Sequence, residues 1–192
     1  MTDGGPSRNN AEPRAALTVE IMRHGGAWED SKIDDALVER AAQAAFALAI
    51  PEDLAFPQDL AIPQDQTAYD ATIVLTDDAE MAELNRTWRG KDAPTNVLSF
   101  PAGEVPGEPG PLGDIVIAFE TTERESNDEN IAFADHVSHL VVHGVLHLLG
   151  LDHMQDDDAE RMEALEIRAL ASIGVADPYK GESATGLAEV AP

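Results

Sequence analysis

The sequence predicts an α/β fold, a single domain in which a small mixed β-sheet has helices packed on it. Three observations predict it. The chain has 192 residues, the size of one domain. Its composition, 43% hydrophobic and 26% charged, is globular and excludes a disordered, collagen-like or coiled-coil chain. From Leu17 onwards, short segments rich in β-branched residues alternate with segments of helical period.

The first half of the chain holds two predicted strands with a helix between them. Leu17 to Met22 alternates apolar and polar residues, as a strand does, and Tyr69 to Leu75 is also strand-like. Asp34 to Ile50 carries its apolar residues at helical spacing, which predicts a helix there.

The second half continues the alternation. Asp77 or Asp78 is expected to cap a helix that contains Met81, Leu84 and Trp88. The other predicted elements are strands at 96–100 and 113–119, a Pro- and Gly-rich loop at 103–110 between them, a long central helix at about 130–149 and a last helix at about 156–171.

The predicted domain spans residues 17–180 and contains one insertion. Residues 1–16 and 181–192 have the composition of disordered segments. Within residues 51–66, Asp-Leu-Ala-Phe-Pro-Gln is followed directly by Asp-Leu-Ala-Ile-Pro-Gln. A six-residue repeat with Pro in each copy suits neither a helix nor a central strand, so we expect an inserted surface loop.

The net charge of the chain limits how it can bind nucleic acid. The formal net charge is −25, so a broad basic surface that binds polyanions is excluded. Any contact with nucleic acid must be local, and the densest cationic stretch contains Arg86, Arg89 and Lys91. On charge alone, a solvated turn is the preferred interpretation of that stretch.

The absence of cysteine restricts both the compartment and the metal chemistry. No disulfide and no thiolate site can form, so a metal ion would need His, Asp or Glu ligands. The N-terminus lacks the apolar core of a secretion signal, and no stretch reaches the roughly 18 apolar residues of a membrane helix. We therefore expect a soluble, cytoplasmic protein without a membrane partner.

Five of the six histidines lie between positions 136 and 153. His136, His139, His143 and His147 are spaced by three, four and four residues, so a helix places them on one face. Burying these imidazoles without partners would be costly, and a metal ion would remove much of that cost. For His139 we rank contact with a metal ligand first, substrate contact second and simple core packing third.

His143, His147 and His153 form the sharpest metal-binding pattern. His143 and His147 are one helical turn apart, and Gly150 can end the helix in the left-handed conformation, so that the chain returns with His153. Three nitrogen ligands leave tetrahedral Zn²⁺ with one open position, as in catalytic sites. The pattern predicts a zinc-bearing central helix.

The same spacing occurs in metzincin proteases, which carry Glu directly after the first His as general base. Here that position is Gly144. A metallopeptidase is therefore disfavoured, because its base is missing. Glycine inside a helix indicates close approach of either a substrate or another chain segment, and these two explanations remain open.

The sequence resembles the YbeY endoribonucleases, a family also described as rRNA maturation factors. The resemblance rests on the segment His143–His153, on Arg89-Gly90-Lys91-Asp92 running into 94–101, and on Gly113-Asp114-Ile115-Val116-Ile117. It extends to Met162-Glu163 and Asp177-Pro178-Tyr179, and so covers most of residues 69–179. Leu151 stands where the family commonly has Tyr.

The resemblance implies a zinc ion on His143, His147 and His153 and an important arginine at Arg89. It further implies a metal-dependent endoribonuclease that prefers single strands and acts in 16S rRNA 3′-end maturation and ribosome quality control. The implied partners are small-subunit rRNA, ribosomal proteins and a ribosome-associated GTPase. Arg86, Lys91 and His139 are further candidates for substrate contact.

A mechanism can be outlined from the residues as a hypothesis. Zinc would lower the pKa of a bound water or polarise a phosphate oxygen. The fixed fork of donors on Arg89 suits the charge that develops on a phosphoryl group in the transition state. No separate general base stands out, although Asp152 is a candidate. Besides the metallopeptidase, the alternative is a ribosome assembly factor whose metal site is mainly structural.

Overall fold

The computed structural model describes residues 16–49, 68–103, 110–151 and 156–180. The predicted disordered segment up to Ala15, the repeat insertion at 51–66, the predicted tail and His153 lie outside the described residues. Ala16, the last residue of the predicted N-terminal segment, already begins the first strand.

The sheet is mixed, as predicted, and has four strands. Its strands are β1 (Ala16–Arg23), β2 (Ala68–Thr76), β3 (Val97–Pro101) and β4 (Pro111–Ala118), arranged in the order β1-β2-β4-β3. β1, β2 and β4 are mutually parallel, and β3 pairs antiparallel with β4. The register aligns Ile21 with Ile73 and Ile73 with Ile115, so one row of β-branched side chains crosses the three parallel strands.

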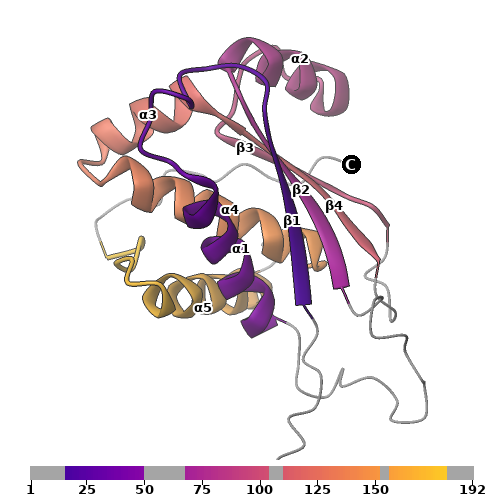
Figure 1. Ribbon diagram of the computed structural model, residues 1–192, viewed down its shortest axis with the longest axis vertical. Helices are drawn as coiled ribbons and strands as arrows, with labels where there is room; N and C mark the ends of the chain where they lie inside the picture. The colour runs from indigo at the N-terminus through magenta and orange to yellow at the C-terminus, as the bar shows by residue number, and fades with distance from the viewer. Residues whose placement is uncertain (1–15, 50–67, 104–109, 152–155, 181–192) are drawn as a thin grey trace, which may run out of the picture.

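Helices cover both faces of the sheet unequally. α1 (Asp35–Ala49), α3 (Phe119–Asp128), α4 (Phe133–Leu148) and α5 (Asp156–Ser172) group on one side, whereas α2 (Asp78–Arg89) stands apart from them (Figure 1). Two apolar clusters confirm this arrangement. Ile115 belongs to the larger cluster with residues of α4, while Val116, its neighbour in β4, packs with Met81 of α2.

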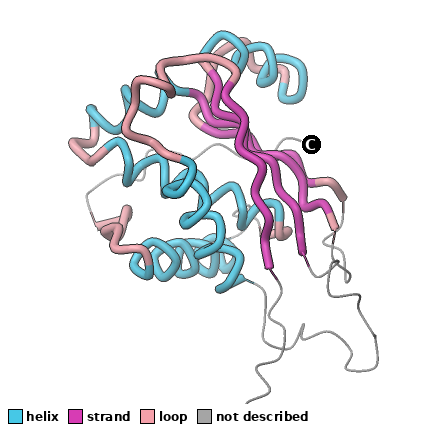
Figure 2. Tube along the Cα trace, viewed as in Figure 1, coloured by secondary structure: helices cyan, strands magenta, loops and turns pink. Residues whose placement is uncertain are grey.

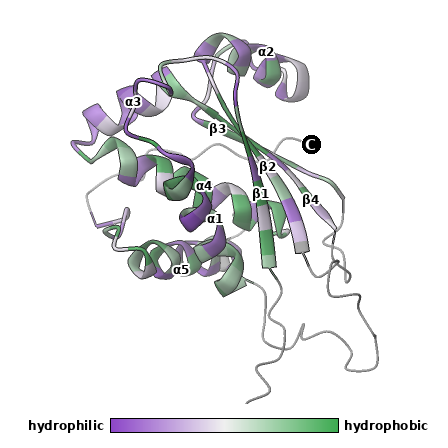
Figure 3. Cartoon of the chain, in the orientation of Figure 1, coloured by the Kyte–Doolittle hydropathy of each residue, from purple (hydrophilic) through white to green (hydrophobic). Residues whose placement is uncertain are grey.

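α4 is the central helix of the domain. Every residue from His136 to Leu148 is buried, and the helix packs on α1, α5, β3 and β4. Figure 3 shows apolar residues along the strands and a mostly hydrophilic α3. A helix buried on all sides can keep polar side chains only where each finds a partner, so the imidazoles of α4 need defined neighbours.

α3 is the element that the sequence analysis did not predict. Its residues are almost all polar after Phe119, so no apolar stripe of helical period indicates it. The long helix expected from position 130 begins instead at Phe133, because Asn130 adopts a left-handed backbone (φ 53°) between the two helices. Figure 2 shows this pair as separate helical segments.

No single helix in the described ranges has the length and apolar character to cross a membrane. α3 and α4 reach that length only as a pair, and the pair is bent by 118°.

Candidate functional site

Three imidazoles of α4 form the buried part of the site. His139 is 7% exposed, and His143 and His147 are each 2% exposed. Consecutive rings lie edge-on to each other, with centroids 6.5 Å apart for His139 and His143 and 4.4 Å apart for His143 and His147. The spacing of three and four residues therefore brings these side chains together as the sequence predicts.

The hydrogen bonds of His143 and His147 determine which ring nitrogen carries the proton. Nδ1 of His147 lies 2.9 Å from the carbonyl oxygen of Leu151, and Nδ1 of His143 lies 2.7 Å from Oε1 of Glu166. Both oxygens are acceptors, so both Nδ1 atoms donate. In the neutral rings each Nε2 then carries a lone pair, and the two Nε2 atoms are 2.9 Å apart.

Two lone pairs that face each other at this distance repel unless a proton or a cation lies between them. Neutral imidazole nitrogen is a preferred ligand of Zn²⁺, and metal-ligating histidines usually donate their other ring N–H to a carboxylate or a backbone carbonyl. His143 has the first kind of partner and His147 the second. The donor set therefore fits two ligands of one metal ion.

The turn after α4 explains how the chain supplies the carbonyl partner. Gly150 has φ 82°, the left-handed conformation that the sequence analysis expected at this position. The N–H groups of Gly150 and Leu151 donate to the carbonyls of His147 and Leu146, the pattern of a Schellman C-cap. The same turn thus ends the helix and directs the Leu151 carbonyl at Nδ1 of His147.

Glu166 of α5 is the carboxylate partner of the site. It is 1% exposed and accepts hydrogen bonds from His143, from Nε2 of His139 at 3.0 Å and from the hydroxyl of Tyr179. Burial alone would raise the pKa of Glu166, but the hydrogen bonds from His139 and His143 outweigh it and hold the pKa well below its usual range. Glu166 is therefore an ionised carboxylate with three donors.

Tyr179, in the segment after α5, contacts this centre through its hydrogen bond to Glu166. Burial, followed by the negative charge of Glu166, raises the pKa of Tyr179 above its ordinary value, so its hydroxyl remains a donor. The sequence analysis assigned neither Glu166 nor Tyr179 a role in the site. A signal for Glu166 existed, because it lies in the buried stripe of α5 with Met162, Ala169 and Leu170, where a lone carboxylate needs a partner.

The third predicted ligand, His153, is among the residues that the structure does not describe. Within the described part of the chain, no three His, Asp or Glu side chains come together as a metal-binding group. His143, His147 and the turn at Gly150 are the described features that bear on the prediction of a metal site, and the roles of all three histidines as ligands stay a prediction.

The structure decides between the two explanations for Gly144. A Cβ atom built at this position would lie 2.8 Å from Cγ2 and 2.9 Å from Cδ1 of Ile115 in β4. Because such distances are shorter than van der Waals contact, Gly144 lets α4 approach the sheet closely. Packing, rather than substrate approach, accounts for the glycine.

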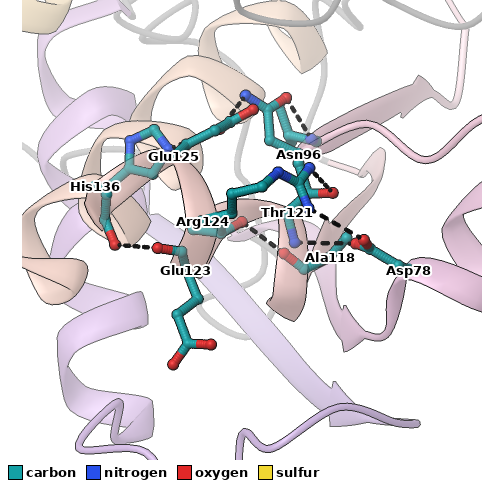
Figure 4. A network of polar contacts seen from close by, with 11 residues as sticks. Asp78, Asn96, Ala118, Thr121, Glu123, Arg124, Glu125 and His136 are labelled. Atoms are coloured by element: carbon teal, nitrogen blue, oxygen red, sulfur yellow. Dashed lines mark hydrogen bonds and ion pairs between the residues drawn. The ribbon is translucent and has the colours of Figure 1, made fainter. Parts of the chain in front are cut away.

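His136 belongs to a separate polar network. Its Nε2 lies 2.9 Å from Oε2 of Glu125 in α3, and the same oxygen accepts from Nδ2 of Asn96 at 3.0 Å (Figure 4). Asn96 also accepts the backbone N–H of Val97 at 2.7 Å. Of the four aligned histidines, three therefore pair with two carboxylates, Glu125 and Glu166, and the fourth, His147, pairs with a backbone carbonyl. A metal ion would have to offset only part of the expected cost of burial.

The cationic stretch lies at the C-terminal end of α2. Arg86 is exposed and forms ion pairs with Glu83 and, at 3.9 Å, with Asp92; Arg89 is half-buried in the last turn, and Lys91 is exposed after it. Asp77 caps the start of this helix by accepting from the N–H of Glu80, and so decides between the two predicted caps.

A defined turn follows these cations. Gly90 adopts φ 66°, and Nδ2 of the buried Asn85 donates to the carbonyl of Ala93 at 2.7 Å. The N–H of Lys91 donates to the carbonyl of Asn85 at 3.3 Å. The polypeptide that carries Arg89 and Lys91 is therefore held by its own hydrogen bonds.

The apolar clusters beside α4 and α2 include neighbouring residues of the same strand, β3. Val97 of β3 packs in the cluster that contains α4, and Leu98, next to it, packs in the cluster that contains Met81 of α2. β3 is the last strand in the sheet order.

Fold and site define a single-domain α/β protein with a buried histidine–carboxylate centre and a cationic turn at the C-terminal end of α2. The model of the family described as Endoribonuclease YbeY matches residues 30–174. The chain belongs to this family, as the motifs indicated.

Proteins named endoribonuclease YbeY are similar over most of the chain. The protein from Parvibaculum lavamentivorans is 47% identical over 192 residues, which cover 93% of this chain and 95% of that protein. The protein from Bradyrhizobium diazoefficiens is 42% identical over 185 residues, 93% of each chain. The solution structure of TM1509 from Thermotoga maritima aligns with a TM-score of 0.50 at 22% identity, covering 85% of this chain and 100% of that one, and so supports the fold.

Proposed function

We propose that this protein is a zinc-dependent, single-strand endoribonuclease of the cytoplasm that acts in 16S rRNA 3′-end maturation and ribosome quality control. The observation that carries the proposal is the pair of Nε2 atoms of His143 and His147, 2.9 Å apart, with both Nδ1 atoms already donating. The names of the similar proteins, which are endoribonucleases, support RNA as the substrate.

His143 and His147 would hold the metal ion through Nε2, with His153 as the third ligand. When bound, zinc supplies Lewis-acid chemistry that activates water or polarises a phosphate oxygen. Glu166 and the carbonyl of Leu151 fix the tautomers and orientations of the two rings before any metal arrives. His139 contributes through Glu166, whose second oxygen it contacts, and we keep a direct contact with substrate as its alternative role.

Arg89 would stabilise the phosphoryl group in the transition state. Its guanidinium offers a planar fork of donors that a phosphate oxygen pair can accept. Arg86 and Lys91 would position the neighbouring phosphates, because the chain as a whole, at −25, repels RNA elsewhere. Ribosomal proteins and a ribosome-associated GTPase are the proposed protein partners.

The experiment compares cleavage of a single-stranded oligoribonucleotide and of a denatured protein by the zinc-loaded enzyme. We expect cleavage of RNA only, loss of cleavage with a chelator, and recovery with Zn²⁺. Arg89→Ala should lower kcat/KM for RNA by about 100-fold or more, as loss of one transition-state donor does. Arg40→Ala, an exposed arginine of α1, is the matched control and should cleave RNA like the wild type.

His147→Ala separates a catalytic metal from a structural one. We expect a folded protein with the circular dichroism of the wild type, a weakened zinc affinity and no cleavage. A protein that unfolds on this change would instead support the assembly factor with a structural metal, and normal RNA cleavage by Arg89→Ala would show that the role given to Arg89 is wrong. Cleavage of the denatured protein would instead favour the metallopeptidase.

A further inference from the structure

We propose that Trp88 is a stacking surface for a nucleobase of single-stranded RNA. The inference rests on the proposed function, because it names how the same cationic turn would bind the RNA next to the scissile region. It assigns a binding role to a residue that carries no charge and no catalytic group.

Trp88 is exposed although it continues an apolar stripe. Met81, Leu84 and Trp88 share one face of α2, and Met81 is fully buried against the sheet. Trp88 is 49% exposed, and in the described ranges the other large hydrophobic residues with comparable exposure are Met22 and Ile131. Half of an indole in water loses much of the stabilisation that burial would give it, so core packing alone does not explain a tryptophan here.

An aromatic contact from the sheet supports the indole. Its ring meets Phe100 of β3 with centroids 5.8 Å apart and planes at 68°, an edge-on contact. Phe100 is itself partly buried against the α2 cluster. This contact holds the indole in place while leaving ring surface open, which is the arrangement that lets a base stack without a loss of side-chain freedom.

The residues around Trp88 carry positive charges that can bind a phosphate backbone. Arg89 follows it directly, and the exposed side chains of Arg86 and Lys91 lie two residues before it and three after it. The ion pairs of Arg86 with Glu83 and Asp92 are on the surface, where such pairs contribute little and a phosphate can compete for the guanidinium. Aromatic side chains flanked by cations are the recurrent means of binding single strands.

The position of the indole also fits the path of the substrate. Trp88 contacts Phe100 of β3, and α4, the helix that carries the histidines, packs on the same strand. At Gly90, an added Cβ would meet nothing within 4 Å, so the turn that follows Trp88 is open to solvent. A base on Trp88 would therefore anchor RNA on one side of β3. Bases in a duplex are already stacked, so this surface selects single strands.

Tryptophan fluorescence tests the proposal directly. The chain has two tryptophans, and Trp28 is buried, 1% exposed, with its Nε1 donating to Thr76. We expect a short oligouridylate to quench the emission of the full-length zinc protein and not that of Trp88→Phe, in which only Trp28 remains. An abasic ribose-phosphate oligomer of equal length carries the same charge without bases and should leave both proteins unquenched.

Affinity and kinetics provide the second readout. Trp88→Ala should weaken binding of oligouridylate about 5- to 100-fold and raise KM with little change in kcat, because stacking holds the bound strand rather than the transition state. Trp88→Phe should retain most of the affinity. A merely structural indole would change the urea midpoint of unfolding and leave KM unchanged.

The outcomes separate this inference from the proposed function. If RNA is cleaved but Trp88 is not quenched, or if the abasic oligomer quenches equally, the stacking surface is wrong while the nuclease stands. If oligouridylate quenches Trp88 in a protein that cleaves no RNA, the stacking surface stands and the nuclease proposal is wrong.

Discussion

The buried face of α4 and the exposed end of α2 hold their polar groups in opposite ways. His139 and His143 share one ionised carboxylate, and His147 donates to a backbone carbonyl, so these rings are oriented by the protein itself. At the end of α2 the protein fixes the backbone through Gly90 and Asn85 and leaves Arg86, Trp88 and Lys91 exposed. The contrast fits the proposed roles, in which the first region would hold an ion and the second would receive a polymer.

The largest expected effect comes from breaking the orientation of the buried rings. In Glu166→Gln the amide has one acceptor oxygen and one donor group, so it cannot accept from both His143 and His139 as the carboxylate does. We expect zinc affinity to fall about 10- to 100-fold, the usual effect of removing the partner of a ligating imidazole. Competition with a chromophoric chelator measures it.

Glu163→Gln is the matched control, because Glu163 is exposed on the same helix. It should bind zinc like the wild type. Equal zinc affinities for Glu166→Gln and the wild type would show that Glu166 serves stability alone, and the contrast between the two regions would lose its basis.

The second-largest expected effect is a loss of stability when the close packing of α4 on the sheet is disturbed. Gly144→Ala places a methyl group within 3 Å of Ile115, and overpacking of this kind typically costs about 1–3 kcal/mol. Alanine also favours the helix by up to about 1 kcal/mol, so we expect a net loss of about 1–2 kcal/mol in the free energy of unfolding. Urea denaturation measures the change.

A double variant checks the cause. Ile115→Val removes the Cδ1 atom that the new methyl group would meet at 2.9 Å. If the clash is real, Gly144→Ala combined with Ile115→Val should lose less stability than the sum of the two single changes. Strict additivity would mean that Cδ1 does not contribute to the clash and that the contact with Cγ2, at 2.8 Å, accounts for it.

The predictable parts of this molecule are those in which local pattern and tertiary role agree. Periodicity predicts the four strands and the shared helix face of His143 and His147. The requirements of a helix end predict the left-handed conformation of Gly150. Each of these features is determined by residues within one turn or one strand, so the sequence contains the whole signal.

The missing parts depend on partners that are distant in the chain. Glu166 lies 23 residues after His143, and Glu125 lies 11 residues before His136, so neither pairing can be derived from local spacing. α3 was also not predictable from local sequence patterns. It carries no apolar stripe, and its Glu125 becomes informative only once Asn96 and His136 are known to lie beside it.

The smallest expected effect concerns the turn that presents Arg89 and Lys91. Gly90 has φ 66°, and no atom lies within 4 Å of a Cβ added there, so Gly90→Ala introduces backbone strain without a clash. A left-handed alanine costs about 1 kcal/mol, and we expect the free energy of unfolding to fall by that amount. Gly90→Asn should lose less, because Asn tolerates this conformation. Thermal or urea unfolding of the two variants measures the difference. Equal losses for Ala and Asn would mean that the turn is not held in the left-handed region, and the cationic end of α2 would then lack the fixed backbone that distinguishes it from a solvated turn.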